Sequence, residues 1–87
     1  MSISHSDFFR LLPRAVGEHP YSINGTEVTI ELASGRLEIR LSSEGIRQIA
    51  SLTLPETVLE FSFSGVDATG RNAFLSQFDL AYQRGGG

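Results

Sequence analysis

Apolar and polar side chains alternate along two stretches in the middle of the chain, residues 27–32 and 36–41. A period of two is typical of a β-strand that buries one face and exposes the other. Ser34-Gly35 between the stretches is a turn signal, so we expect an antiparallel hairpin with a two-residue loop at 34–35. That register places Leu32 opposite Leu37, and every apolar residue of one strand then faces an apolar residue of the other.

A second turn signal precedes this hairpin. Asn24-Gly25 is the preferred pair for a type I′ turn, in which both central residues need a positive φ. A loop at 24–25 adds a strand before residue 27 and places Tyr21 opposite Val28 on the same apolar face. Pro20 is compatible only with the start of this strand or with an edge position, because proline cannot donate to a ladder.

The segment 43–50 changes its period. Ile46, Ile49 and Ala50 have helical spacing, whereas Ala50 and Leu52 begin a strand-like alternation. Such a change of phase indicates either a β-bulge or one helical turn before a strand, and we favour a bulged strand.

Pro55-Glu56 is interpreted as the next turn, because proline commonly opens turns between strands. A loop at this position would place Leu52 opposite Leu59. The last predicted strand covers residues 58–63 and points Leu59, Phe61 and Phe63 toward the core.

One helix is predicted at each end of the sheet region. In residues 4–16 the apolar positions recur with helical spacing, and Ser4 or Ser6 is the expected N-cap. Pro13 inside this helix predicts a kink or break, and Gly17 is expected to end it. The second helix begins at Asp67 or Thr69 as its cap. Its apolar stripe consists of Phe74, Leu75, Phe78, Ala81 and Tyr82.

Together these elements predict an α+β fold: an N-terminal helix, a five-stranded antiparallel meander sheet and a C-terminal helix. Both helices should cover the apolar face of the sheet, because each has a single apolar stripe. We expect one domain over residues 1–84 and a flexible glycine tail over 85–87. A chain of 87 residues buries a smaller fraction of its surface than a large domain does, so association with a partner would add stability.

Composition narrows the classes of function. The formal net charge is −3, and the seven basic residues, all arginine, are scattered. This balance argues against nucleic acid as a partner, which requires clustered positive charge. No apolar run approaches the ~20 residues that span a bilayer, and the N-terminus lacks the pattern of a signal peptide. We therefore expect no membrane partner and a cytoplasmic location.

The residues suited to catalysis or metal binding do not form a recognisable set. The chain has no cysteine, and its histidines, His5 and His19, are isolated. His5 and Asp7 offer two metal ligands where a site needs three or four, so we expect neither a metal nor a cofactor. Glu31 and Glu38 would face each other across the central hairpin. A close carboxylate pair can perform acid-base chemistry, although exposed sheet faces also carry such charges without a catalytic role.

The leading hypothesis is a non-catalytic module that binds a protein partner or a second copy of itself, with a homodimer as the simplest form. The polar sheet face and two apolar helix residues outside the main stripes make up the predicted interaction surface: Phe9, Thr29, Glu31, Glu38, Arg40 and Leu80. Exposed apolar residues and sheet edges are common features of such surfaces.

The end of the chain, Arg84-Gly85-Gly86-Gly87, resembles the Gly-Gly ending of ubiquitin-like modifiers and bacterial sulfur-carrier proteins. The resemblance implies a carrier that is activated at the C-terminal carboxylate, with Gly86 and Gly87 as its functional tail. In that family the fold is a β-grasp and the tail follows a strand, whereas here the tail follows a predicted helix. A glycine that ends a helix is the alternative interpretation.

As a whole, the chain resembles small bacterial proteins of unknown function. The residues that carry this resemblance are a Phe-rich last helix followed by Gln83-Arg84 and glycines. It implies no activity, cofactor or site.

Overall fold

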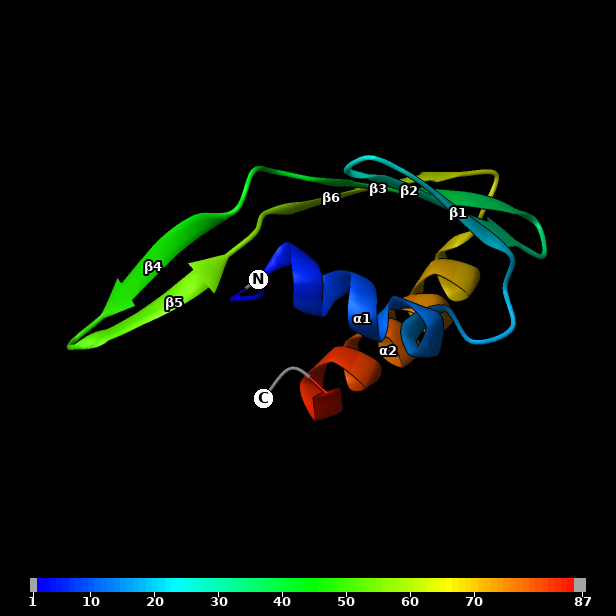
Figure 1. The fold of residues 1–87 in the computed structure, drawn as a ribbon. Helices are drawn as coiled ribbons and strands as arrows, with labels where there is room; N and C mark the ends of the chain where they lie inside the picture. Colours follow the sequence, from blue (N-terminus) through cyan, green and yellow to red (C-terminus); the bar gives the residue numbers. More distant parts are fainter. Residues whose placement is uncertain (1, 86–87) are drawn as a thin grey trace.

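The computed structural model of the chain describes residues 2–85 (Figure 1). In sequence order its elements are α1 (His5–Val16), β1 (Tyr21–Asn24), β2 (Glu27–Leu32), β3 (Gly35–Leu41), β4 (Gly45–Ile49), β5 (Leu52–Glu56), β6 (Leu59–Ser64) and α2 (Ala68–Gly85). Four strands form an antiparallel sheet in the order β1-β2-β3-β6, while β4 and β5 form a separate pair. The predicted α+β class is confirmed. The prediction of one five-stranded meander is wrong.

The meander fails because β3 through β6 form a single long hairpin. β3 pairs with β6, and the two strands between them in sequence pair with each other. The chain reverses at Ala50–Ser51 and not at the predicted Pro55-Glu56, which lies inside β5. Leu59 consequently lies opposite Leu41 and not opposite Leu52.

Pro55 fits inside β5 because of the phase of this hairpin. The two-residue loop makes Ile49 and Leu52 the first hydrogen-bonded pair, and hydrogen-bonded and non-hydrogen-bonded pairs then alternate. Ile46 and Pro55 form a non-hydrogen-bonded pair, whose backbone groups point away from the partner strand. The N–H that proline lacks would therefore point to the outer edge of β5, and no ladder bond is lost.

A β-bulge separates the two halves of the long hairpin. The N–H of Ser42 donates to the carbonyl of Val58 at 2.9 Å, just before the first pair of β4 and β5. Between these pairs, residues 43–44 lie opposite the single residue Thr57. The change of phase in the sequence is therefore a bulge that leads into a strand, and the alternative of a helical turn is wrong.

The two short hairpins keep their predicted faces but have other registers. β2 and β3 turn at Ala33–Ser34, so Ile30 lies opposite Leu37, and Leu32 lies opposite Gly35. A Cβ at Gly35 would collide with the carbonyl of Ser64 in β6. This glycine is therefore needed inside the strand and not in the turn. A shift of two residues leaves each side chain on its original face.

The β1–β2 turn uses Gly25–Thr26, so Tyr21 lies opposite Ile30 and not opposite Val28. Gly25 has a φ of 63°, and Thr26 is not among the positive-φ residues. One positive φ at the first central position is typical of a type II′ turn, whereas the predicted type I′ turn requires two.

The capping residues predicted for the two helices include the ones that the structure shows. Ser4 is the N-cap of α1, and its Oγ accepts a hydrogen bond from a first-turn N–H at 3.1 Å. The helix runs through Pro13 without the predicted break and ends before Gly17, whose φ is 63°. Asp67 caps α2 in the same way, with its carboxylate accepting a first-turn N–H at 2.8 Å.

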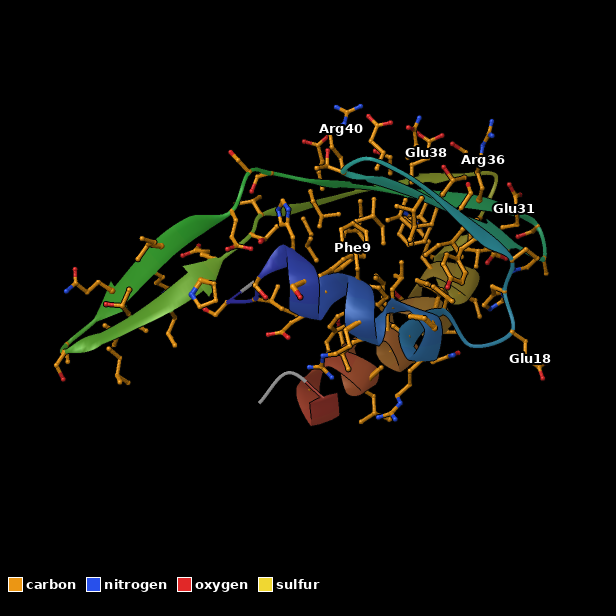
Figure 2. All side chains as sticks on the ribbon, in the orientation of Figure 1. Phe9, Glu18, Glu31, Arg36, Glu38 and Arg40 are labelled. Atoms are coloured by element: carbon orange, nitrogen blue, oxygen red, sulfur yellow. The ribbon has the colours of Figure 1, made fainter. Side chains whose placement is uncertain are left out.

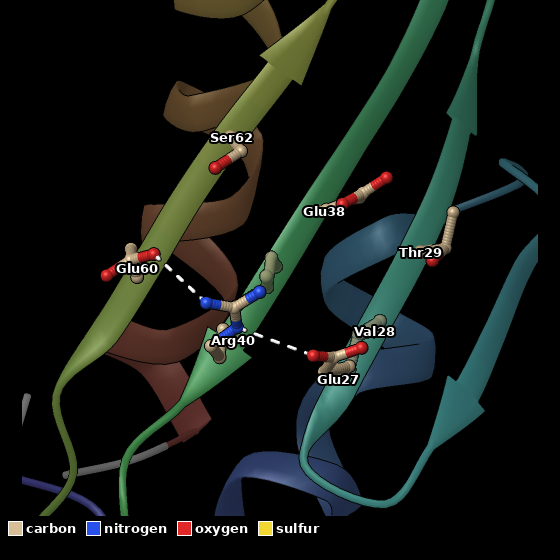
Figure 3. A pocket seen from close by; sticks show the side chains of 8 residues that line it. Glu27, Val28, Thr29, Glu38, Arg40, Glu60 and Ser62 are labelled. Carbon is tan, nitrogen blue, oxygen red and sulfur yellow. Dashed lines mark ion pairs between the residues drawn. The ribbon is translucent and has the colours of Figure 1, made fainter.

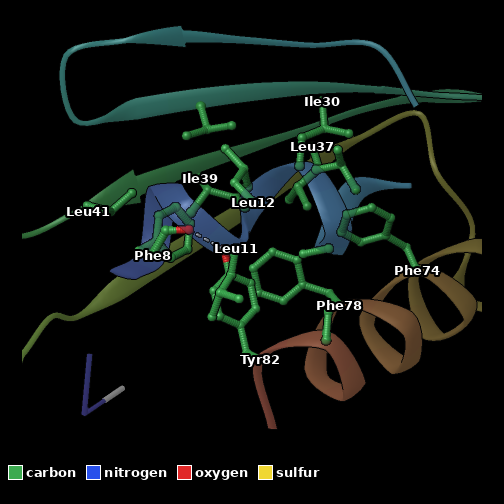
Figure 4. Packing of buried hydrophobic residues seen from close by; sticks show 14 of the residues in the cluster. Phe8, Leu11, Leu12, Ile30, Leu37, Ile39, Leu41, Phe74, Phe78 and Tyr82 are labelled. Carbon is green, nitrogen blue, oxygen red and sulfur yellow. Dashed lines mark hydrogen bonds between the residues drawn. The ribbon is translucent and has the colours of Figure 1, made fainter. Parts of the chain in front are cut away.

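The core lies between the four-stranded sheet and the two helices, which Figure 1 shows on the same side of that sheet. Aliphatic residues of β2 and β3 meet a group of aromatic rings from the helices (Figure 4), which Phe61 of β6 joins. Phe78 is at the centre of this group. Its ring centroid lies 6.4 Å from that of Phe8, 5.4 Å from Phe61, 5.9 Å from Phe74 and 4.7 Å from Tyr82.

Tyr82 links α2 to α1 through a buried hydrogen bond, in which its hydroxyl donates to the carbonyl of Phe8 at 2.8 Å. Burial raises the pKa of this phenol well above its ordinary value. The folded state therefore holds the phenol proton more tightly than the unfolded state does. Stability from this group is complete below pH ~10 and falls as the pH rises above that value.

Tyr82→Phe should lower the free energy of unfolding at pH 7 by about 1 kcal/mol, because it leaves the Phe8 carbonyl without this donor. It should also remove part of the stability loss above pH ~10. Urea unfolding at pH 8 and pH 11 measures both effects. The exposed Tyr21→Phe serves as the control and should keep the alkaline loss. An equally steep loss in Tyr82→Phe would contradict the assignment.

Candidate interaction surface: an exposed hairpin arm

The β4–β5 arm, residues 45–56 together with the flanking Val58, projects beyond the helices (Figure 1). The arm projects because the long hairpin exceeds the helices in length. Fully extended, the chain from residue 35 to residue 49 would span about 50 Å, and the bulge shortens this, whereas the 12 residues of α1 span about 18 Å. The helices cover the β3–β6 half and leave the distal half uncovered. The molecule accordingly extends 45 Å along its longest axis and 24 Å along the next.

The arm exposes large apolar side chains. Ile46 is 77% exposed, Ile49 46%, Leu52 62% and Val58 60%. None of them belongs to the core cluster or to the half-buried residues packed against it. Strand alternation places Ile49 and Leu52 on one face of the arm and Ile46 on the other, so neither face is covered by the rest of the described chain.

The tip of the arm has an unusual backbone. Ala50 has a φ of 54°, the only positive φ found at a non-glycine residue within 2–85. A residue with a Cβ is disfavoured in this region, and turns that require it usually carry glycine. The tight two-residue reversal at Ala50–Ser51 is therefore imposed by the pairing of the strands and not by a local turn signal.

The base of the arm is held by the start of α1. Thr57 is fully buried, and its hydroxyl donates to the carbonyl of Ile3 at 2.8 Å. The Nε2 of His5 lies 2.7 Å from the carbonyl oxygen of Ser42; because a carbonyl only accepts, Nε2 carries the proton. The backbone N–H of His5 also donates to a carboxylate oxygen of Glu44 at 2.7 Å. These three contacts fix the bulge against the first turn of the helix.

The outer face of the four-stranded sheet carries the charged part of the predicted surface. Arg40 lies between two carboxylates, with Nε 3.4 Å from Glu27 and Nη1 3.8 Å from Glu60 (Figure 3). All three side chains are more than half exposed, so each pair contributes at most about 1 kcal/mol. The hollow around them measures about 140 Å³, well below the ~300 Å³ of a typical ligand pocket.

Three of the predicted surface residues meet in this hollow: Thr29, Glu38 and Arg40. Figure 2 shows Glu38 and Arg40 pointing away from the helices. Glu31 lies opposite Arg36, and Glu38 lies opposite Thr29. The predicted face-to-face pair of Glu31 and Glu38 is therefore wrong, because the hairpin register is shifted by two residues.

The remaining predicted residues are elsewhere. Phe9 is half-buried, packs against the core and lies edge-on to Phe8 at 5.4 Å (Figure 2), so its expected exposure is wrong. Leu80 on α2 is 48% exposed. The predicted carrier tail, Gly86 and Gly87, lies outside the described residues, and Gly85 is the last residue of α2.

Both histidines make contacts within the fold. Asp7 pairs with Arg10 at 3.4 Å, so it does not join His5 as a ligand pair. His19 packs edge-on to Phe74 at 5.8 Å. Within residues 2–85 there is no group of three or more side chains that could hold a metal ion. Neither described helix is long and apolar enough to cross a membrane.

Comparison with known proteins adds no relative. No protein-family model, no curated protein and no solved structure matches the chain significantly. The functional argument therefore depends on the residues of this chain alone.

The sequence pattern does not reveal the arm, because the predicted turn at Pro55-Glu56 places Leu52 opposite Leu59 within a single sheet. Alternation shows that a strand has an apolar face, but it does not show what covers that face. One signal in the sequence favours the observed turn. A turn at 50–51 pairs Ile49 with Leu52 and points the missing N–H of Pro55 away from the partner strand. A turn at Pro55-Glu56 leaves the change of period at 43–50 unexplained.

Thr57→Val should lower the free energy of unfolding by about 1–3 kcal/mol, because it leaves the Ile3 carbonyl without its buried donor. Thr53→Val, the same change at an exposed position of the arm, should alter it by less than about 0.5 kcal/mol. Urea unfolding measures both values, and equal effects would show that the contact at the base of the arm is not stabilising.

Proposed function

We propose that this chain is a non-catalytic protein-interaction module whose docking element is the β4–β5 arm. The observation that carries the proposal is the exposure of Ile46, Ile49, Leu52 and Val58 on an arm that the rest of the described chain does not cover. An isolated two-stranded hairpin is marginally stable in water, and exposed apolar patches mark interaction sites. A protein surface that packs against the arm would stabilise the hairpin and cover its exposed apolar side chains.

The fixed base of the arm supports this role. The contacts of Thr57 and His5 with the chain around them hold the bulge in one geometry, so the arm is presented in a defined direction. A docking element that is ordered before binding loses less conformational entropy when its partner arrives. The charged outer face supports catalysis less well, because the carboxylates of Glu27 and Glu60 are already paired with Arg40.

The test starts with one substitution at each of two equally exposed isoleucines, Ile49 in the arm at 46% and Ile23 in β1 at 49%. Ile49→Thr removes apolar area from the arm, and Ile23→Thr is its matched control. The arm variant then adds Leu52→Thr, which removes more of the apolar area, and the β-branched threonine suits a strand at each position. Native purification with cross-linking, followed by mass spectrometry, measures every bound protein, including a second copy.

We expect the arm variant to lose its bound protein by about 10-fold or more, which corresponds to about 1.4 kcal/mol of binding free energy. The Ile23→Thr control should retain it. Equal losses in both variants, or no bound protein on the unaltered chain at any concentration, would refute the proposal.

A further inference from the structure

The two edges of the arm differ in their capacity to pair with another strand. In the non-hydrogen-bonded pairs of the arm, Ile46 with Pro55 and Gln48 with Thr53, backbone groups point outward. On the β5 side one of these outward positions is Pro55, which has no N–H to offer. On the β4 side both Ile46 and Gln48 present a free N–H and C=O pair. β5 therefore has a blocked edge, and β4 has an open one.

Proteins usually protect an open edge with proline, with a bulge or with several charges. In β4 the bulge lies before the strand, there is no proline, and Arg47 is the single charged residue. Exposed apolar residues stand on both faces beside this edge, namely Ile46 and Ile49. The β4 edge is thus the part of the arm at which strand addition is least opposed.

We propose that the partner of this edge is a second copy of the chain, and that the two β4 strands pair antiparallel about a two-fold axis to form a continuous sheet β5-β4-β4-β5. This inference rests on the proposed function, and it names the partner and the mode of binding. A two-fold contact is isologous, so one open edge satisfies the other.

The contact is made by strand edges and not by faces. Strand addition covers the backbone edge of β4 and the flanks of Ile46 and Ile49, whereas Leu52 and Val58 lie outside β4 and keep their exposed faces. The area taken from each partner is therefore below the about 800 Å² of a standard interface, so we expect a weak dimer.

The charges select the register. Pairing Arg47 with Arg47 of the second copy places like charges directly opposite each other and is disfavoured. Pairing Ile46 with Ile46 of the second copy places Arg47 opposite Gly45, which has no side chain. Beyond that glycine, on the same face, lies Glu56, its cross-strand partner in β5. The guanidinium can extend over the glycine toward this carboxylate of the second copy, and none of the ion pairs within residues 2–85 engages either group.

With Ile46 on the axis, residues 45–47 of the two β4 strands pair with one another, and Gln48 and Ile49 lie beside the bulge of the second copy, residues 43–44. An axis at Arg47 pairs all five residues of β4 but places the two arginines directly opposite each other. Charge therefore selects the arrangement with Ile46 at the centre.

A matched pair of proline substitutions tests the edge. Gln48→Pro and Thr53→Pro alter the two members of one non-hydrogen-bonded pair, so neither removes a bond from the ladder within the arm. Gln48→Pro closes the open edge, and Thr53→Pro alters the edge that Pro55 already blocks. Sedimentation equilibrium should give a dimer for the unaltered chain and for Thr53→Pro, with a dissociation constant at least about 10-fold higher for Gln48→Pro.

Single cysteines test the register independently of proline tolerance. The chain has no cysteine of its own, so each variant carries one thiol. Ile46→Cys should form an intermolecular disulfide under mild oxidation, because directly opposite residues in a hydrogen-bonded pair have Cα atoms about 5.5 Å apart. Arg47→Cys, Gln48→Cys and the β5 control Thr53→Cys should cross-link at least about 10-fold more slowly.

Each outcome has a definite meaning. A dimer that survives Gln48→Pro, or cross-linking that is fastest at residue 53, overturns the β4 edge, and fastest cross-linking at 47 or 48 overturns the register. A strict monomer at millimolar concentration overturns the second copy as partner. If the Ile49→Thr and Leu52→Thr variant still loses a different protein in that case, the interaction module stands and only this inference fails.

Discussion

The long hairpin that runs from β3 through β4 and β5 to β6 is longer than the layer of helices that can cover it, and most features of this molecule follow from that mismatch. A hairpin that runs from Gly35 to Ser64 has a proximal half under α1 and α2, and a distal half whose faces are not covered by any other part of residues 2–85. Interstrand hydrogen bonds keep the distal half extended, because each strand satisfies the inner backbone groups of the other. The apolar side chains of that half are consequently left in water.

The bulge at residues 43–44 converts this excess length into a directed arm. An extra residue in one strand bends the ribbon and exchanges the faces of the strand that follows. The buried Thr57 and the start of α1 then hold the bend through hydrogen bonds to the Ile3 and Ser42 carbonyls. Residues 3–5 therefore begin α1 and also orient the arm. A change in the first turn of α1 consequently affects the direction of the arm, which is far from it in sequence.

Much of the fold could be predicted from the sequence, because the relevant signals are local. Alternation in β2 and β3, the Ser4 cap and the Gly17 stop depend on nearest neighbours along the chain. The turns could not be placed to the residue. The sequence pattern predicts Gly35 in a turn, whereas the structure requires this glycine for its close approach to Ser64 in β6. That requirement exists only after β6 has paired with β3.

The arm could not be predicted for a related reason. Its reversal uses Ala50, a residue with no turn preference, while Pro55 has a strong turn preference and lies within a strand. Both choices are stabilised by the pairing of the whole hairpin and not by their own sequence neighbourhood. Thr29, Glu38 and Arg40 share one sheet face because their placement depends only on strand alternation, which the register shift of two residues preserves.

Charge explains why contact through an arm suits this chain. The outer sheet face carries four glutamates, Glu27, Glu31, Glu38 and Glu60, against two arginines, and the whole chain has a net charge of −3. Two such bodies that stacked face to face would repel each other at short range. Contact through arms that project from the body keeps the acidic faces more than a Debye length of about 8 Å apart, where salt screens most of the repulsion. The apolar, nearly neutral arm is thus the region through which two copies can approach each other at the least electrostatic cost.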